Sequence, residues 1–186
     1  VTDLDTIVNR CGLSKEIVAS TLQSLSSRNL LYTGPTGSGT PGYAILQVGY
    51  GMPQPFLWGG KQDARARQMS RLILNYFSTP TTQKVYGGVS TKTYKYSPAN
   101  VSLDVSLQGC LPHERMEPIV QTSTQIAVAH CPCRMSARVL GRTDCPHSLE
   151  VCIKYDDMAE FVISKGLARE ISKDEALHIL GACEKE

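Results

Sequence analysis

Near the start of the chain, apolar residues recur at the spacing of two successive helices. Thr2 is expected to cap the first helix and Gly12 to end it. The apolar face of this helix would consist of Leu4, Ile7, Val8 and Cys11. Ser14 is expected to cap the second helix, whose apolar stripe continues to about Asn29. The chain is therefore predicted to open with a helix, a tight turn and a second helix.

Two short apolar runs after these helices predict a hairpin. They are "LLY" at 30–32 and "YAILQV" at 43–48, and the Gly- and Pro-rich tip TGPTGSGTPG lies between them. Helix, turn, helix and hairpin together resemble a winged helix-turn-helix unit over residues 1–48. The first helix of such a unit would lie before Val1, so we expect residues upstream of it.

The middle of the chain, residues 49–95, is predicted to be a connector with one helix. Its first stretch, GYGMPQPFLWGG at 49–60, carries too many large apolar side chains for a free linker and should be packed. Helical periodicity then extends from Lys61 to Phe77.

The remaining residues, 96–186, alternate between strand and helix patterns. A strand interrupted by Pro98 is predicted over 91–107, and a short helix from Leu111 to Val120. A buried strand at 125–130 leads directly to Cys131. Helices are predicted from Ser148 to about Gly166 and, after a capping box that begins at Ser172, to about Cys183. The fold class is therefore α+β, with a winged-helix-like unit followed by a small α/β cysteine-cluster domain.

Charge and composition limit the classes of partner. The net charge is +2, with 41% hydrophobic and 19% charged residues, as in ordinary globular proteins. No apolar stretch approaches the roughly 20 residues of a membrane-spanning helix, and no secretory signal is visible. We therefore expect a cytoplasmic protein that does not insert into a membrane.

The cations are concentrated in the segment 61–96, which is expected to face an acidic partner. The presumptive recognition helix, 15–28, offers only Lys15 and Arg28 against Glu16, and the wing tip has no cation. Because DNA affinity depends on Lys and Arg that meet phosphates, DNA binding is possible but disfavoured. A protein-docking role is preferred for residues 1–48.

Four of the seven cysteines lie close together, at Cys131, Cys133, Cys145 and Cys152. Without a secretory signal, such cysteines indicate metal or redox chemistry rather than a disulfide framework. Four thiolates can saturate a tetrahedral zinc ion or hold a four-iron cluster. The spacing C-x-C-x11-C-x6-C matches neither the usual zinc knuckles nor the bacterial ferredoxin run, so both metals remain open.

Local features favour iron and sulfide. Arg134, Arg138 and Arg142 could offset the negative charge of a cluster, and a helix that starts near Ser148 could direct its N-terminus towards it. Cys145 should then lie in the loop before that helix, and the C-x-C loop should be partly exposed near Pro132 and Arg134. His130 and His147 are expected to be hydrogen-bonding neighbours. Structural roles are expected for Cys11, Cys110 and Cys183.

The segments IAVAHCPCR, DCPHSLEVC and GLAREISKDEALHIL resemble a family of four-iron–four-sulfur binding proteins from anaerobic microbes. The resemblance implies a [4Fe-4S] cluster held by Cys131, Cys133, Cys145 and Cys152. It also matches Arg134 to an arginine after C-x-C and Glu150 to an acid before the last cysteine. Many family members continue into further cysteine motifs, whereas this sequence ends at Glu186.

The functional expectation is an electron-transfer or accessory redox subunit with a protein redox partner. The sequence has no phosphate-binding glycine loop, nucleophile motif or carboxylate pair, so the chain is not expected to be an enzyme on its own. A redox-sensing winged-helix transcriptional regulator and a structural zinc-binding module are the alternatives.

Overall fold

The computed structural model of the protein describes residues 1–46, 53–87, 116–142 and 145–183. Within these ranges the fold is mixed α+β, with two small antiparallel sheets of three strands each. No helix in them has the length and apolar character needed to cross a bilayer. The predicted strand at 91–107 and Cys110 lie outside the described residues.

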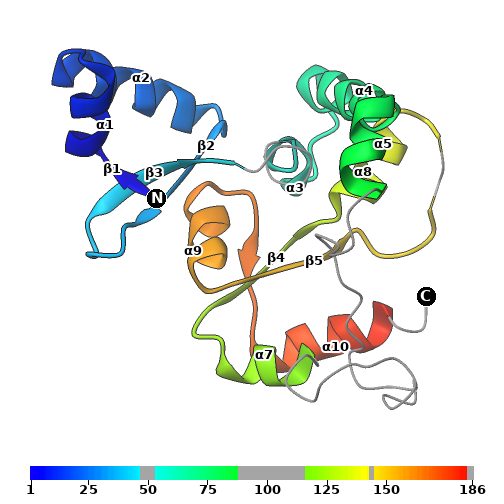
Figure 1. The fold of residues 1–186 in the computed structure, drawn as a ribbon. Helices are drawn as coiled ribbons and strands as arrows, with labels where there is room; N and C mark the ends of the chain where they lie inside the picture. The colour runs from blue at the N-terminus through cyan, green and yellow to red at the C-terminus, as the bar shows by residue number, and fades with distance from the viewer. Residues whose placement is uncertain (47–52, 88–115, 143–144, 184–186) are drawn as a thin grey trace. The chain divides into compact units, whose positions relative to one another are not determined.

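The chain divides into two compact units, Val1–Phe56 and Leu57–Glu186. The first unit contains β1 (Thr2–Asp3), α1 (Leu4–Cys11), α2 (Lys15–Ser27), β2 (Leu31–Pro35) and β3 (Pro41–Ile45). Its sheet has the order β1-β3-β2 (Figure 1). The division of the chain into 1–48, 49–95 and 96–186 stays a prediction.

Local signals explain the helix boundaries of the first unit. Asp3, not Thr2, caps α1, because its carboxylate accepts the Thr6 N–H at 2.8 Å while Thr2 pairs with Tyr43 in the sheet. Gly12 ends α1 with a left-handed φ of 65°, and Ser14 caps α2, both as predicted. The hairpin 31–45 is also present.

Cys11 was predicted to be a core residue on the apolar face of the first helix, and this prediction is wrong. It is exposed and lines an apolar hollow of about 280 Å³ in the first unit, beside Ile7, Leu22 and Ile45. Helical spacing places Cys11 on the apolar face of α1, but it does not show that the hollow on this face stays open to solvent.

The second unit begins within α3 (Pro55–Trp58) and contains most of the helices. They are α4 (Ala64–Phe77), α5 (Pro80–Gly87), α7 (Met116–Thr122), α8 (Pro132–Val139), α9 (Asp156–Ser164) and α10 (Lys173–Cys183). Its strands are β4 (Ile126–His130), β5 (Glu150–Tyr155) and β6 (Arg169–Glu170), in the order β5-β4-β6. Leu57 and Trp58 are buried, which confirms that this part of the connector is packed.

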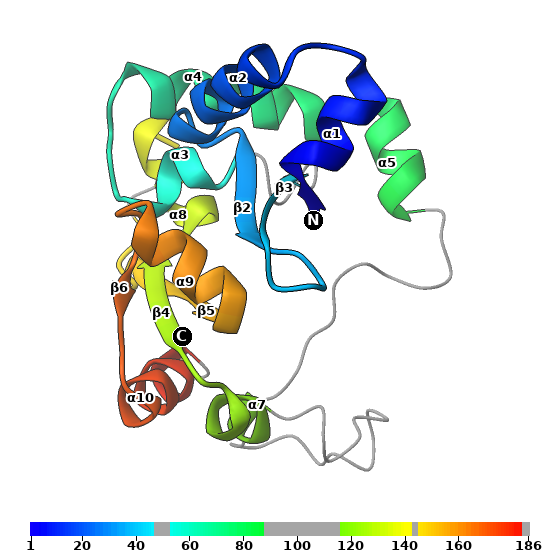
Figure 2. The same ribbon diagram turned by 90° about the vertical axis from the view of Figure 1, so that its left-hand side faces the viewer.

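The sheet of the second unit lies between two layers of helices (Figures 1 and 2). Alternate residues of a strand face opposite sides, so Ile126 and Val128 turn towards α7 and α10. They form a core with Val120, Ile171 and Ala176. The other face of β4 carries the small residues Ala127 and Ala129, and α9 packs against the sheet from that side.

The helix predicted from Ser148 to Gly166 is wrong in its first half. Residues Glu150–Tyr155 form β5, and a helix begins only at Asp156. The apolar residues fit helical spacing, but pairing with the buried strand β4 satisfies the backbone of 150–155 instead. Consequently, no helix N-terminus lies at Ser148.

A second core fixes α8 against α4. It consists of Leu57, Ala66, Met135 and Val139, with Ile73, Leu140 and Leu149 packed around it. Helix α4 begins three residues later than predicted from Lys61, because the Asp63 side chain accepts the Ala66 N–H and caps it. This core holds α8, and with it the C-x-C segment, at one end of the sheet.

Candidate functional site

Cys131 and Cys133 lie at the start of a helix rather than in the short loop that was predicted. Cys131 is the N-cap residue of α8, Pro132 is its first residue, and Cys133 follows. Pro132 is buried and Cys133 is exposed. The predicted exposure therefore applies to Cys133 and not to Pro132. The positive end of a helix does face these cysteines, but it belongs to α8.

The thiols of Cys131 and Cys133 interact directly. A hydrogen bond from the Cys133 thiol, together with the backbone N–H groups of Arg134 and Cys133 and the Arg134 charge, lowers the pKa of Cys131 to about 6. The same hydrogen bond, burial of the thiol and the negative charges of Cys131 and Cys152 raise the pKa of Cys133. One thiol of the pair thus ionises readily while the other holds its proton.

Cys152 reaches the same place from β5. It pairs with Ala129 in β4, and a register shift lies between Ala129 and His130, where Val151 is the extra residue. Beyond it, the Cys131 N–H donates to the Leu149 carbonyl at 2.6 Å. Strand pairing therefore brings the end of β4 and the start of β5 together, and the charge of Cys152 acts on Cys133.

Cys145 lies in the irregular segment before β5 and is half-buried. Its position before a regular element agrees with the prediction, although that element is a strand. Within the described ranges, no three His, Cys, Asp or Glu side chains are arranged to hold one metal ion. The structure thus places Cys131 and Cys152 within electrostatic reach of Cys133, and these sulfur donors suit either iron or zinc.

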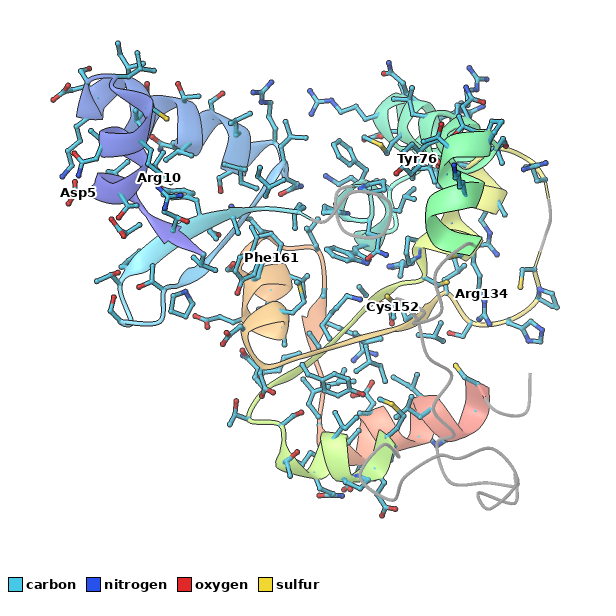
Figure 3. The ribbon with its side chains drawn as sticks, in the orientation of Figure 1. Asp5, Arg10, Tyr76, Arg134, Cys152 and Phe161 are labelled. Carbon is cyan, nitrogen blue, oxygen red and sulfur yellow. The ribbon has the colours of Figure 1, made fainter. Side chains whose placement is uncertain are left out.

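Arg134 connects α8 to the segment that precedes β5. Its guanidinium donates to the Ser148 carbonyl, and its charge favours the Cys131 thiolate. Figure 3 labels Arg134, which belongs to α8, and Cys152, which belongs to β5. Arg134 is half-buried and Arg142 is exposed.

Lys154 is a site residue that the sequence reasoning missed. Its Nζ donates to the Cys152 Sγ at 2.9 Å and lies 4.9 Å from the centre of the Trp58 ring. Its position two residues after Cys152 on a strand could have identified it, since such residues share a face. Because a helix was predicted for residues 148–166, Cys152 and Lys154 were not expected to lie on the same face.

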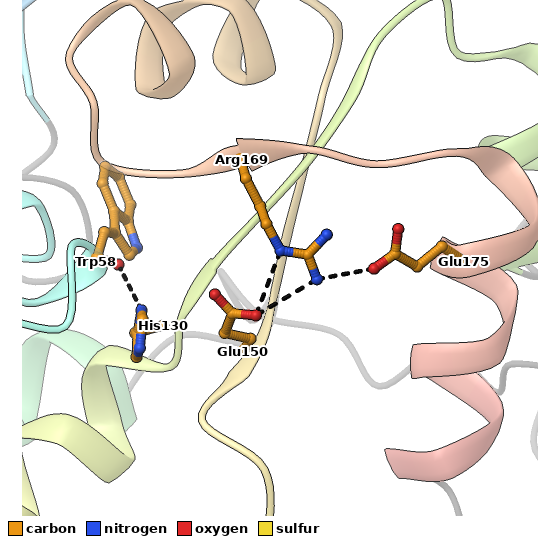
Figure 4. Close-up of polar contacts among 5 residues, drawn as sticks. All are labelled: Trp58, His130, Glu150, Arg169 and Glu175. Atoms are coloured by element: carbon orange, nitrogen blue, oxygen red, sulfur yellow. Dashed lines mark hydrogen bonds and ion pairs between the residues drawn. The ribbon is translucent and has the colours of Figure 1, made fainter.

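His130 was expected to be a hydrogen-bonding neighbour of the cysteines, and its side chain bonds to the connector instead. Its Nδ1 lies 3.2 Å from the Trp58 carbonyl oxygen, and because a carbonyl can only accept, Nδ1 carries the proton (Figure 4). Gly60 packs on the other side of the ring, where a Cβ would lie 2.7 Å from the His130 Nε2. His130 therefore contacts both Trp58 and Gly60.

Glu150 belongs to an ion-pair group instead of the cysteine site. Arg169 lies 3.3 Å from Glu150 and 2.7 Å from Glu175, and so joins β5, β6 and α10 (Figure 4). The Ser172 hydroxyl accepts the Glu175 N–H at 3.1 Å, so the first half of the predicted capping box is present. Arg169, Glu150 and Glu175 are partly exposed, so their ion pairs contribute little to the free energy of folding. Their main effect is to align β5, β6 and α10.

The basic residues of α4 are exposed as well. Arg67 and Arg71, four residues apart on one helical face, line a polar hollow of about 560 Å³ with Gln62, Asp63 and Gln68. Lys84 of α5 is exposed too, and residues 88–96 of the predicted basic segment lie outside the described ranges.

Comparison of the chain with family models, with curated proteins and with solved structures found no match.

Proposed function

We propose that this chain binds one [4Fe-4S] cluster through Cys131, Cys133, Cys145 and Cys152. It would act as an electron-transfer or accessory redox component of the cytoplasm, where thiols stay reduced. The observation that supports this proposal best is the approach of three of the four cysteines from the end of β4, the start of α8 and β5. Four cysteine ligands leave no open iron position for a substrate, and the cluster would supply one-electron storage.

The surrounding residues support a negatively charged group at this place. The first turn of α8 directs backbone N–H groups towards Cys131, and Arg134 adds a positive charge. The exposed Cys133 is the position from which an electron could pass to a protein redox partner. The arginines of α4, beginning with Arg67 and Arg71, offer an acidic partner a docking surface.

The test is purification without oxygen, followed by measurement of iron, acid-labile sulfide and zinc. We expect about four iron and four sulfide per chain. One zinc per chain without sulfide would overturn the cluster and favour the structural zinc module.

A redox-sensing winged-helix regulator is the second candidate. The sheet order β1-β3-β2 with the helix pair α1 and α2 supports it, since a winged helix has a similar order of elements. Exposed apolar side chains at Leu13 and Ile17 favour protein docking over DNA at the same surface. DNA binding that falls steeply with salt and changes on cluster oxidation would establish the regulator. Equal, weak binding by holo and apo protein would exclude it.

A further inference from the structure

We propose that Lys154 is a positioning residue of the cysteine site, held by Trp58, which donates a hydrogen bond to the Cys152 sulfur and raises the reduction potential of the bound cluster. The inference rests on the proposed function and concerns the regulation of the same site. Three observations support it: the 2.9 Å contact between the Lys154 Nζ and the Cys152 Sγ, the ring of Trp58 at 4.9 Å, and the burial of Trp58.

The strand places the two side chains together. Cys152 and Lys154 are two positions apart on β5, so their side chains lie on the same face of the sheet. This is the face that carries Ala127 and Ala129. Those alanines are their direct partners on β4, and both are fully buried. Because the partners are small, the long side chain of Lys154 can lie along the sheet and bring its ammonium group back to the sulfur.

Trp58 fixes Lys154 from the other side. Trp58 is only 2% exposed. Its backbone carbonyl accepts the hydrogen bond from His130, the residue that precedes Cys131. Trp58 thus supports two residues beside the cysteine site. Its backbone carbonyl binds His130, and its ring contacts Lys154. A lysine held by a buried ring and a sulfur loses side-chain freedom, and a surface lysine would not remain in one such position without those contacts.

The position of the ammonium group determines its effect. A hydrogen bond to a ligand sulfur withdraws electron density from the metal centre, and a positive charge favours the more negative, reduced state. Both effects raise the reduction potential. Arg134 differs because its guanidinium donates to the Ser148 carbonyl. Lys154 donates directly to a cysteine sulfur, so its charge acts on the ligand itself.

The experiment compares Lys154→Met, Lys154→Arg and Lys173→Met with the wild-type protein. Lys173→Met is the charge-matched control, because Lys173 donates to the Gln121 carbonyl and lies beyond the opposite end of β4. For each protein purified without oxygen, iron and sulfide content are measured first and the midpoint potential second.

We expect all variants to keep the cluster. The reduced-to-oxidised ratio of Lys154→Met should fall about tenfold at a fixed ambient potential, which is about 59 mV for a one-electron couple. Lys154→Arg should recover most of the potential, and Lys173→Met should match the wild type. Equal potentials in Lys154→Met and Lys173→Met overturn the proposal. Loss of the cluster in Lys154→Met but not in Lys154→Arg supports the contact, and loss in both overturns it.

Failure of the proposed function would be recognised separately. If the wild type contains zinc without sulfide, the cluster is excluded, and Lys154 is tested on protein loaded with Co²⁺ alone. Loss of the hydrogen bond in Lys154→Met should then move the sulfur-to-cobalt charge-transfer band to longer wavelength, and an unmoved band overturns the role of Lys154. A wild-type chain that binds neither iron nor Co²⁺ overturns both proposals.

Discussion

At the scale of single residues, the two cysteines of the C-x-C segment have opposite properties. The N-terminus of α8 and the Cys133 thiol favour ionisation of Cys131, while Cys133 holds its proton. Metal ligation requires both as thiolates, because a bound cation replaces the proton. Without a metal, the proton held by Cys133 keeps the two sulfurs from carrying like charges, and a bound metal would take the place of that proton.

Replacing Cys133 by Ser should remove the cluster and loosen residues 131–152. Among the described residues of 140–149 no side chain is fully buried, so this segment depends on the ligands at its two ends. Iron content and amide hydrogen exchange would measure the two effects. Cys11→Ser is the matched control, since Cys11 is exposed and lies in the first unit. A Cys133→Ser protein with full iron content would contradict the assignment.

Replacing Arg134 by Ala should leave the cluster bound and lower its midpoint potential. The change removes a positive charge that favours the Cys131 thiolate, and a nearby positive charge favours the reduced state. The control is Arg142→Ala, which removes the same charge from an exposed position. If the potential of Arg134→Ala equals that of the control, Arg134 acts only by holding the Ser148 carbonyl.

At the scale of elements, the turn at Gly60 positions the end of β4. Gly60 has a φ of 71°, and a Cβ there would meet the His130 ring. Gly60→Ala should therefore destabilise the second unit by about 1–2 kcal/mol for the left-handed backbone, with a further cost for the contact. Urea unfolding would measure it. Gly59→Ala is the control, because a Cβ there meets only Leu167 at an ordinary 3.8 Å.

The start of helix α1 should make the stability of the first unit dependent on acidic pH. Hydrogen bonds from the Thr6 backbone and side chain lower the pKa of Asp3 below 3.8. Its contribution is therefore complete above that value and is lost as the pH falls through the folded-state pKa. Asp3→Asn keeps the cap without the charge, so its stability should change less in this window. Asp3→Ala should be less stable at neutral pH, as measured by circular dichroism.

The same Asp3 experiment has an internal control in Asp5→Ala. Asp5 pairs with Lys15 at 2.6 Å, but both side chains are largely exposed, so the pair contributes little. If Asp5→Ala lowers the melting temperature as much as Asp3→Ala, the capping argument fails.

At the scale of the whole molecule, metal removal should act on one unit only. All four candidate ligands belong to the unit Leu57–Glu186, and binding of a metal to the folded state stabilises that state. A chelator should therefore increase hydrogen exchange in β4, α8 and β5 and leave α1, α2 and β3 unchanged. Equal increases in both units would show that they unfold together.

The sequence by itself determined the parts of the fold that depend on nearby residues. Ser14 and Gly12 were identified as helix boundaries because a cap is formed between residues three or four positions apart. The strand predicted at 125–130 from the apolar run 126–129 is present as Ile126–His130, and residues 126–129 are buried as expected. The cysteine spacing likewise identified the candidate ligands, which remain a prediction.

Only the tertiary structure decided how residues 148–166 are divided. Their apolar residues fit a helix, yet Val151, Ile153 and Tyr155 also suit a strand, and the buried edge of β4 supplied the pairing partner. The same pairing placed Cys152 opposite Ala129 and turned Lys154 towards Trp58. These residues are far apart in the chain, so no local pattern records their contact. It exists because a strand needs a neighbouring strand to satisfy its backbone hydrogen bonds, and the choice of neighbour is made by the whole fold.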